Sequence, residues 1–211
     1  MSAQLYYITD RRQFAGDATE QERRLLQKIG ECAGAGVEYV QLREKDLSTR
    51  ALEELAQKAM AAVRGYGTKL LINSRTDIAL AWGAHGVHLP GNDLAASEVR
   101  AVFSQARAGA AAPVIAVSTH SLADVERAEA HGADFAVFAP VFEKSAIANS
   151  AGLEQLRQIC RRAHAAMPVF ALGGVNMENA RGCLQAGAAG IAGIRLFQEN
   201  EVSRVVTALR S

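Results

Sequence analysis

Several features that would assign a function directly are scarce in this sequence of 211 residues. Its three cysteines, Cys32, Cys160 and Cys183, lie far apart and form no CxxC pair, so we expect reduced thiols rather than a disulfide framework or a zinc site. No apolar run approaches the roughly 20 residues that span a bilayer, and no Pro- or Ser-rich linker divides the chain. We therefore expect one cytoplasmic domain over residues 1–211, with no membrane partner.

An excess of charge of either sign is also lacking. The 23 Lys and Arg residues almost balance the 22 Asp and Glu residues, which leaves a formal net charge of +1. Such a chain has no global field that would attract nucleic acid or an anionic surface. We therefore expect no nucleic-acid partner, and any bound anion must be held by local groups.

What the sequence does contain is an internal repeat. A Gly-Ala pair closes a helical stretch and precedes a short apolar run four times, beginning at Gly34, Gly83, Gly132 and Gly187. The first three pairs are 49 residues apart and the fourth follows after 55, a period that suits two strand-helix units. Four such periods predict eight strands.

The strand candidates are nearly continuous apolar runs, which is typical of buried parallel strands. They are Leu5–Thr9, Val37–Leu42, Lys69–Asn73, Val87–Leu89, Pro113–Val117, Phe135–Ala139, Pro168–Leu172 and Gly190–Ile194. Amphipathic stretches alternate with them, and Ser48, Ser121 and Asn176 are the expected helix N-caps. This order predicts an α/β fold, a single (β/α)8 TIM barrel, whose chemistry belongs at the C-terminal ends of the strands.

The second strand runs into a row of anion-binding side chains. Gln41, Arg43 and Lys45 alternate along the chain, so they share one face and continue toward the rim of the barrel. An amide, a guanidinium and an ammonium in one line suit a diphosphate. The alternative is a salt-bridge network in which Arg43 and Lys45 pair with Glu44, Asp46 or neighbouring acids, and charge alone favours this alternative.

Other strand ends carry short polar groups with two roles open to each. Asp93 is a candidate magnesium ligand, although its position before a helical stretch favours an N-cap. His120 is a candidate acid/base group or the donor of a hydrogen bond to a loop carbonyl, whereas His88 lies in an apolar run and should be buried and neutral. Gly173-Gly174 and Gly193 follow or end the last two strands, where barrels often bind phosphate through backbone N–H groups.

Taken in order, these segments resemble the thiamine phosphate synthase/TenI family over nearly the whole chain. The resemblance rests on Tyr7-Ile8-Thr9-Asp10, Gln41 to Lys45, Asn73-Ser74-Arg75, Gly86 to Leu89 with Asp93, Val117 to Ser121, Pro140-Val141-Phe142 and Gly173-Gly174. Synthases of this family join a hydroxymethylpyrimidine diphosphate to a thiazole phosphate with Mg²⁺ and release diphosphate. The resemblance also favours a homodimer.

The resemblance implies a role for each candidate residue. Diphosphate contacts fall on Gln41, Arg43, Lys45, Asn73 and Ser118, the magnesium ligand is Asp93, and backbone near Gly173, Gly174, Gly193 and Ile194 binds the thiazole phosphate. Departure of diphosphate leaves a stabilised cation, so the chemistry needs a neutralised leaving group and close reactants rather than a strong base. Arg43, Lys45 and Ser118 are therefore the expected catalytic residues.

Three departures from the synthase pattern keep other functions open. Ser74 stands where synthases usually carry a second magnesium-binding aspartate, Pro90 is typical of TenI-type members, and the segment from Phe142 to Ser150 lacks the usual Thr-x-Thr-Lys run. TenI-type enzymes are metal-independent thiazole phosphate tautomerases, for which His120 would be the catalytic acid/base. A non-catalytic binder of thiamine-related phosphates is a third hypothesis. The Gln41, Arg43 and Lys45 row favours the synthase, because a tautomerase has no use for it.

Residues 143–151 are a candidate lid.

Overall fold

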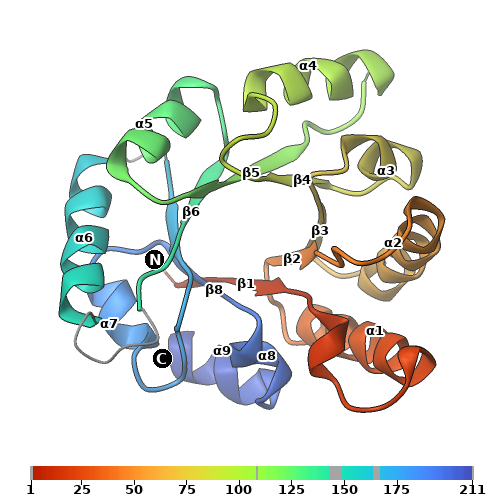
Figure 1. Ribbon diagram of the computed structural model, residues 1–211, viewed down its shortest axis with the longest axis horizontal. Coiled ribbons are helices and arrows are strands. Elements are labelled where there is room, and N and C mark those ends of the chain that lie inside the picture. The colour runs from red at the N-terminus through yellow and green to blue at the C-terminus, as the bar shows by residue number, and fades with distance from the viewer. Residues whose placement is uncertain (1, 108, 143–148, 164–166, 211) are drawn as a thin grey trace.

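Eight parallel strands close into a barrel in the order in which they occur along the chain (Figure 1). The computed structural model describes residues 2–107, 109–142, 149–163 and 167–210. The strands are β1 (Gln4–Ile8), β2 (Tyr39–Leu42), β3 (Lys69–Asn73), β4 (Gly86–Leu89), β5 (Val114–Thr119), β6 (Phe135–Phe138), β7 (Val169–Ala171) and β8 (Gly190–Gly193). Each predicted apolar run contributes one strand, so the predicted (β/α)8 barrel is confirmed.

Helices surround the barrel on its outer face (Figure 1). They are η1 (Arg11–Gln13, a 3₁₀ turn), α1 (Ala18–Gly34), α2 (Thr49–Val63), α3 (Thr76–Ala81), α4 (Ala96–Ala106), α5 (Leu122–Ala130), α6 (Asn149–Arg162), α7 (Ala180–Gln185), α8 (Arg195–Gln198) and α9 (Val202–Arg210). Among the helices of the described residues, none has the length and apolarity that crossing a bilayer requires.

The predicted helix starts are correct at two of three positions. The Ser48 hydroxyl accepts from the Ala51 backbone N–H, and the Ser121 hydroxyl accepts from that of Asp124, as N-caps do. The prediction at Asn176 is wrong, because α7 begins at Ala180. Asn176 instead accepts from the backbone N–H groups of Glu178 and Asn179, which closes a turn before the helix.

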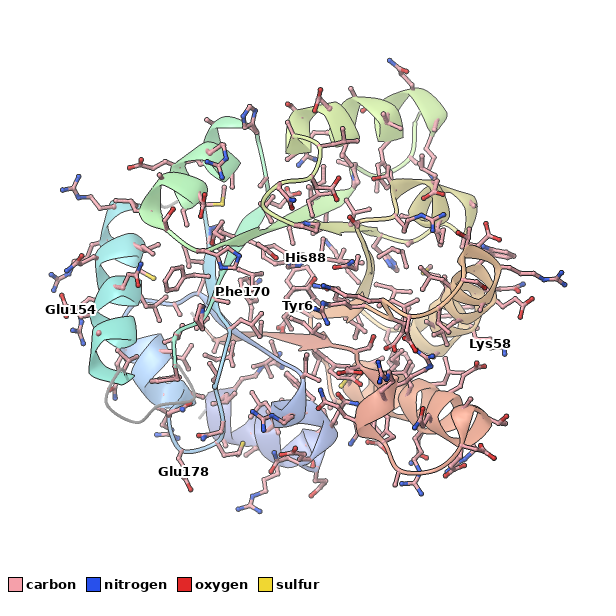
Figure 2. The ribbon with its side chains drawn as sticks, viewed as in Figure 1. Tyr6, Lys58, His88, Glu154, Phe170 and Glu178 are labelled. Carbon is pink, nitrogen blue, oxygen red and sulfur yellow. The ribbon has the colours of Figure 1, made fainter. Side chains whose placement is uncertain are left out.

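The strands bury both of their faces, and each face belongs to a different core. Along β1, Leu5 and Tyr7 pack with the helices in the outer core, whereas Tyr6 and Ile8 belong to the core inside the barrel. Figure 2 shows Tyr6, His88 and Phe170 at the centre, with charged residues such as Lys58 and Glu154 on the periphery. This two-sided burial is why the strands read as continuous apolar runs.

Aromatic rings fill much of the inner core. The ring of Phe170 lies 4.6 Å from that of Phe135 and 6.2 Å from that of Tyr6, measured between centroids, and Tyr39 lies 4.9 Å from Phe135. Such edge and tilted contacts stabilise aromatic clusters beyond the area that they bury. The barrel interior is therefore a packed core that supports the polar groups nearer the strand ends.

Two neighbouring tyrosines on β1 offer a test of this packing. The buried Tyr6 hydroxyl bonds to Gln41 and His88, whereas the buried Tyr7 hydroxyl has no partner among the described residues. We expect Tyr6→Phe to lower the free energy of unfolding by about 1–3 kcal/mol, because it leaves buried polar groups unpaired, and Tyr7→Phe to leave it unchanged or raise it. Urea denaturation of both variants measures this, and equal losses in the two would contradict it.

Candidate active site

The closed parallel barrel brings the predicted site residues to one end of the molecule. Because all eight strands run in the same direction, their C-terminal ends surround a single mouth. The residues at these ends are Arg43 and Lys45 after β2, Asn73 and Ser74 at β3, Asp93 after β4, Ser118 and His120 at β5, Gly173 and Gly174 after β7, and Gly193 and Ile194 at β8. Gln41 lies within β2 and is buried.

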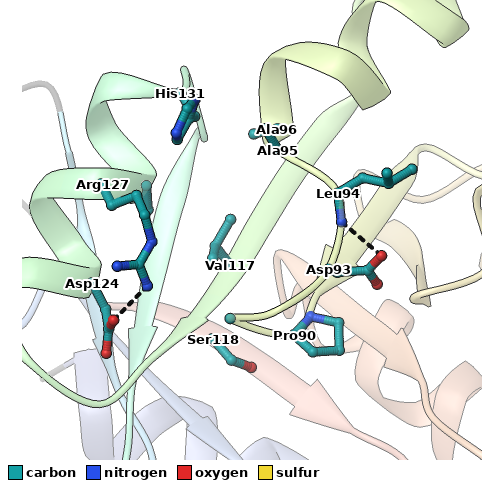
Figure 3. Close-up of a pocket in the computed structure, with 12 residues that line it drawn as sticks. Pro90, Asp93, Leu94, Ala95, Ala96, Val117, Ser118, Asp124, Arg127 and His131 are labelled. Atoms are coloured by element: carbon teal, nitrogen blue, oxygen red, sulfur yellow. Dashed lines mark hydrogen bonds and ion pairs between the residues drawn. The ribbon is translucent and has the colours of Figure 1, made fainter.

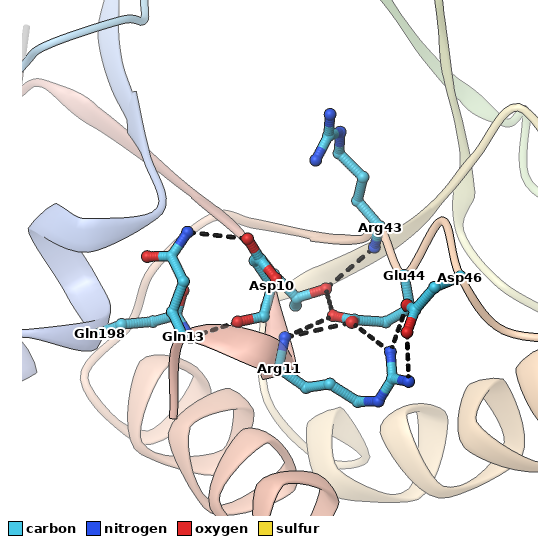
Figure 4. Close-up of polar contacts among 8 residues, drawn as sticks. Asp10, Arg11, Gln13, Arg43, Glu44, Asp46 and Gln198 are labelled. Carbon is cyan, nitrogen blue, oxygen red and sulfur yellow. Dashed lines mark hydrogen bonds and ion pairs between the residues drawn. The ribbon is translucent and has the colours of Figure 1, made fainter. Parts of the chain in front are cut away.

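The side chains of Arg43 and Lys45 are left without an anionic partner. Arg11, in η1, forms a two-pronged ion pair with Asp46 through N–O distances of 2.7 and 2.8 Å, and its Nη1 also lies 3.0 Å from Glu44 Oε2 (Figure 4). Within the described part of the chain, the side chains of Arg43 and Lys45 make no hydrogen bond or ion pair. The salt-bridge alternative is therefore wrong for these two cations, because Arg11 occupies the acids.

A buried chain of hydrogen bonds crosses the barrel beneath Arg43. Gln41 Nε2 donates to the Tyr6 hydroxyl at 3.0 Å, Tyr6 lies 3.0 Å from His88 Nδ1, and His88 Nε2 lies 2.7 Å from the Ser118 hydroxyl. Since the Tyr6 oxygen accepts from Gln41, its single proton is donated to His88 Nδ1. His88 then carries its proton on Nε2 and donates to Ser118, which leaves the Ser118 proton for a ligand.

His88 is the buried, neutral histidine that its apolar run predicts. Its ring is 3% exposed, and burial, assisted by the nearby Arg43 cation, lowers the pKa of His88 to about 3. A neutral imidazole is the form that the hydrogen-bond chain requires. The Gln41 amide donates to Tyr6 inside the barrel, so a contact between Gln41 and a diphosphate stays a prediction.

Asp93 faces Ser74 across the ends of β4 and β3. Ser74 is the one non-glycine residue with a positive φ among the described residues, at 62°, and its hydroxyl donates to Asp93 Oδ2. Asp93 Oδ1 accepts from the Leu94 backbone N–H at 2.8 Å. The N-cap expectation for Asp93 is wrong, because α4 begins at Ala96 and its N-cap residue is Ala95.

A small pocket beside Asp93 lies outside the barrel rather than in its mouth. It has a volume of about 110 Å³ and is closed on one side by the ion pair between Asp124 and Arg127. Figure 3 shows Val117 pointing toward this pocket, while Ser118 points to the opposite side of β5. Ser118 is therefore directed to the barrel interior, where His88 contacts it.

The ends of β7 and β8 form a second pocket of about 350 Å³, the glycine pocket, which Gly173, Gly174 and Gly193 line. The φ angles of Gly173 and Gly174 are 94° and 65°, and a Cβ at either residue would lie 2.7 Å from atoms of Pro140 or Phe142, so only glycine fits both positions. Several backbone N–H groups that border this pocket have no hydrogen-bond partner among the described residues, including those of Gly174, Val175, Arg195 and Leu196. Unpaired N–H groups from two loops suit a phosphate.

His120 follows β5 and is exposed. Its Nδ1 lies 2.6 Å from the Ala139 carbonyl oxygen, so Nδ1 carries the proton of the neutral ring and Nε2 keeps its lone pair. Its backbone N–H donates to Asp124. The predicted hydrogen bond to a loop carbonyl is thus present, and the acid/base role of His120 stays a prediction.

The segment after β6 is described only at its start. The Val141 and Phe142 backbone N–H groups donate to the carbonyls of Leu172 and Gly173, which ties this segment to the glycine turn. Residues 143–148, and with them Lys144 and most of the predicted lid, lie outside the described residues.

Reasoning from the sequence missed two groups that shape the mouth. Arg11 was not predicted as a site residue. The loop after β2 holds two acids and two cations, so a cation from another segment that pairs with the acids leaves Arg43 and Lys45 unpaired. Tyr6 was missed because its hydroxyl lies on an otherwise apolar strand face.

The fold and the mouth define a (β/α)8 barrel suited to small anionic ligands. The sequence profile described as thiamine monophosphate synthase matches residues 5–197, and the chain belongs to that family. A putative thiamine-phosphate synthase 2 of Aquifex aeolicus is 40% identical over 197 residues, covering 92% of this chain and 97% of that protein. A thiamine-phosphate synthase of Syntrophomonas wolfei is 35% identical over 89% of this chain and 85% of its own length.

A solved structure agrees with this assignment. The thiamine phosphate pyrophosphorylase of Pyrococcus furiosus superposes with a TM-score of 0.78 at 30% identity, covering 98% of this chain and 93% of that one. The family predicted from the sequence motifs is confirmed.

The depressed pKa of His88 predicts a specific dependence of stability on pH. Because the folded pKa of about 3 lies below the ordinary value of 6.5, the unfolded chain binds the extra proton and His88 contributes less as pH falls from about 7 toward 3. We expect His88→Gln to cost at least about 1 kcal/mol at pH 7.5 and less at pH 5. Urea unfolding at both pH values tests this, and a cost that grows on acidification would exclude a neutral His88.

Proposed function

We propose that this protein joins a hydroxymethylpyrimidine diphosphate to a thiazole phosphate, forming thiamine phosphate and diphosphate at the mouth of the barrel. The observation that carries the proposal is the unpaired state of Arg43 and Lys45, which lie at the same mouth as the unpaired N–H groups of the glycine pocket. Two anion-binding regions suit two phosphorylated substrates. Family membership supports the same reaction.

The proposed roles follow from the groups that each region offers. Arg43, Lys45 and Asn73 bind the diphosphate, and Ser118 donates the proton that the His88 chain leaves available. As the carbon–oxygen bond to diphosphate breaks, these donors stabilise the charge that develops on the leaving oxygens. The backbone at Gly173, Gly174, Gly193 and Ile194 holds the thiazole phosphate, so that the thiazole nitrogen attacks the pyrimidine methylene carbon.

The donor set near Asp93 fits Mg²⁺ shared with a substrate. Mg²⁺ in phosphate-transfer sites commonly takes one or two carboxylates from the protein and fills its other positions with phosphate oxygens and water. Asp93 supplies a carboxylate and Ser74 a neutral hydroxyl beside it, while the described residues hold no group of three His, Cys, Asp or Glu side chains that would enclose a metal. Bound Mg²⁺ would neutralise part of the diphosphate charge.

The central experiment supplies purified protein with both substrates and Mg²⁺ and measures thiamine phosphate by chromatography. We expect product, and we expect Arg43→Gln to lower kcat/KM by about 100-fold or more, because a preorganised charge on the leaving group is lost. Arg50→Gln, in the exposed Arg50–Glu54 pair of α2, is the matched control and should keep parental activity. Absence of product at high enzyme concentration contradicts the proposal.

The same assay separates the tautomerase hypothesis. A tautomerase would aromatise thiazole phosphate in EDTA and would lose this activity in His120→Ala, whereas the proposed synthase needs the diphosphate substrate and Mg²⁺. Turnover of thiazole phosphate alone would therefore favour the alternative, and ligand binding without either reaction would favour a non-catalytic protein.

Ser74 generates a second prediction about the metal. We expect Ser74→Asp to lower the Mg²⁺ concentration for half-maximal activity several-fold, because a second carboxylate beside Asp93 adds a charged ligand. Aspartate also tolerates the left-handed backbone at this position better than most residues. Ser74→Asn matches the size without the charge, and the same shift in both variants would argue against added metal ligation.

A further inference from the structure

Ion pairs with two acids hold the Arg11 side chain in place. Its side chain is 11% exposed and bonds to both oxygens of Asp46 and to Glu44, and its backbone N–H lies 3.1 and 3.2 Å from the two Glu44 oxygens. A planar guanidinium that binds a carboxylate in this two-pronged way is far more selective than a lysine ammonium. Arg11 is thus fixed on the acids of the loop that follows β2, residues 43–48, here called the β2 loop.

The alternative pairing lies within the β2 loop itself. Glu44 and Asp46 alternate along the chain with Arg43 and Lys45, so without Arg11 the loop carries equal numbers of acids and cations. Either acid would then neutralise a cation directly or repel an incoming phosphate over the Debye length of about 8 Å at physiological salt. A neutral loop is a poor site for a diphosphate.

We propose that Arg11 is a positioning residue that pairs with Glu44 and Asp46 and so keeps Arg43 and Lys45 available for the diphosphate. The inference rests on the proposed function and extends it to a residue outside the predicted site. Figure 4 shows the division: the Arg11 side chain extends to Glu44 and Asp46, while the Arg43 side chain points away from both.

The same network fixes the backbone of Arg43. The buried Thr9 hydroxyl donates to Glu44 Oε1 at 2.6 Å and accepts from the Arg43 backbone N–H at 2.9 Å. Burial raises the pKa of Glu44, and the hydrogen bonds and charge of Arg11 oppose that rise. Arg11 therefore also favours the ionised Glu44 that Thr9 and Arg43 are organised around.

The test measures binding of inorganic diphosphate, with Mg²⁺ at pH 8, by titration calorimetry. We expect Arg11→Gln to weaken binding at least tenfold, since it exposes the diphosphate to two uncompensated acids. The double variant Arg11→Gln/Asp46→Asn restores the parental net charge and removes one of the two competing carboxylates, while the Thr9 hydroxyl and the backbone N–H of residue 11 still bind Glu44. We therefore expect its affinity to return to within threefold of the parent.

A matched control separates this effect from loss of one positive charge. Arg12→Gln removes an exposed arginine from the same 3₁₀ turn, and among the described residues Arg12 acts on Asp46 through its charge alone, without a hydrogen bond or ion pair. We expect it to change the affinity less than twofold. Weakening equal to that of Arg11→Gln would overturn the inference, because any charge in the turn would then serve.

The remaining outcomes are also decisive. Parental affinity in Arg11→Gln overturns the inference and leaves the proposed function intact, whereas absence of diphosphate binding by the parent overturns both. A double variant as weak as Arg11→Gln would show that Arg11 acts through the fold rather than through Asp46. Recovery of affinity without recovery of Tm supports the positioning role, since a purely structural role would restore neither.

Discussion

The parallel pairing of β8 with β1 is the constraint on which the rest of this structure depends. It aligns Tyr7 with Gly193, while β2 pairs on the other side of β1 and aligns Gln41 with Ile8. Closure therefore sets the end of the chain beside its beginning, and the glycine pocket becomes a neighbour of the β2 loop rather than the far edge of an open sheet. Gln198 continues this connection, because its amide donates to the Asp10 carbonyl beside η1 (Figure 4). Two anions held on these loops would share one mouth, as a reaction between two phosphorylated molecules requires.

A barrel of this size has a filled interior, and the filling decides how rigid the mouth is. The aromatic rings of Tyr39, Phe135 and Phe170 leave little room for rearrangement below Tyr6. The hydrogen-bond chain from Tyr6 through His88 to Ser118 therefore lies above a packed core. Because the Tyr6 oxygen accepts from Gln41, each later group in the chain donates toward Ser118. Donors that are oriented before a ligand arrives need no reorganisation as charge develops, which is the principal source of electrostatic catalysis. The neutral state of His88 matters for the same reason, because a protonated ring would donate from both nitrogens and could not accept the hydrogen bond from Tyr6.

The parts of this architecture that follow local rules could be predicted from the sequence. Continuous apolar runs gave all eight strands, because burial on both faces leaves no polar alternation, and Ser48 and Ser121 were recognised as caps from their neighbours alone. The errors fall where two segments compete for one group. Asp93 was predicted to cap the helix that follows it, but its carboxylate contacts Ser74 on another strand end. The salt-bridge alternative paired Arg43 with acids that Arg11 already binds, and the predicted diphosphate contact of Arg43 is not affected by that error. Composition and spacing do not determine which of several equal charges pair, because that choice depends on the rotamers and loop geometry that the closed barrel imposes.

The distribution of charge at the mouth explains how a nearly neutral protein can attract anions. With a net charge of +1, no long-range field is available, so the local field must come from pairing some charges and leaving others unpaired. Arg11 pairs with the two acids of the β2 loop, which leaves Arg43 and Lys45 without an ion pair among the described residues. A serine at position 74 acts in the same direction, since it leaves this region one negative charge poorer than two aspartates would. For the proposed function, this one residue implies weaker Mg²⁺ binding and stronger direct attraction of phosphate, so the proposed site depends more on its own cations than a site with two carboxylates would.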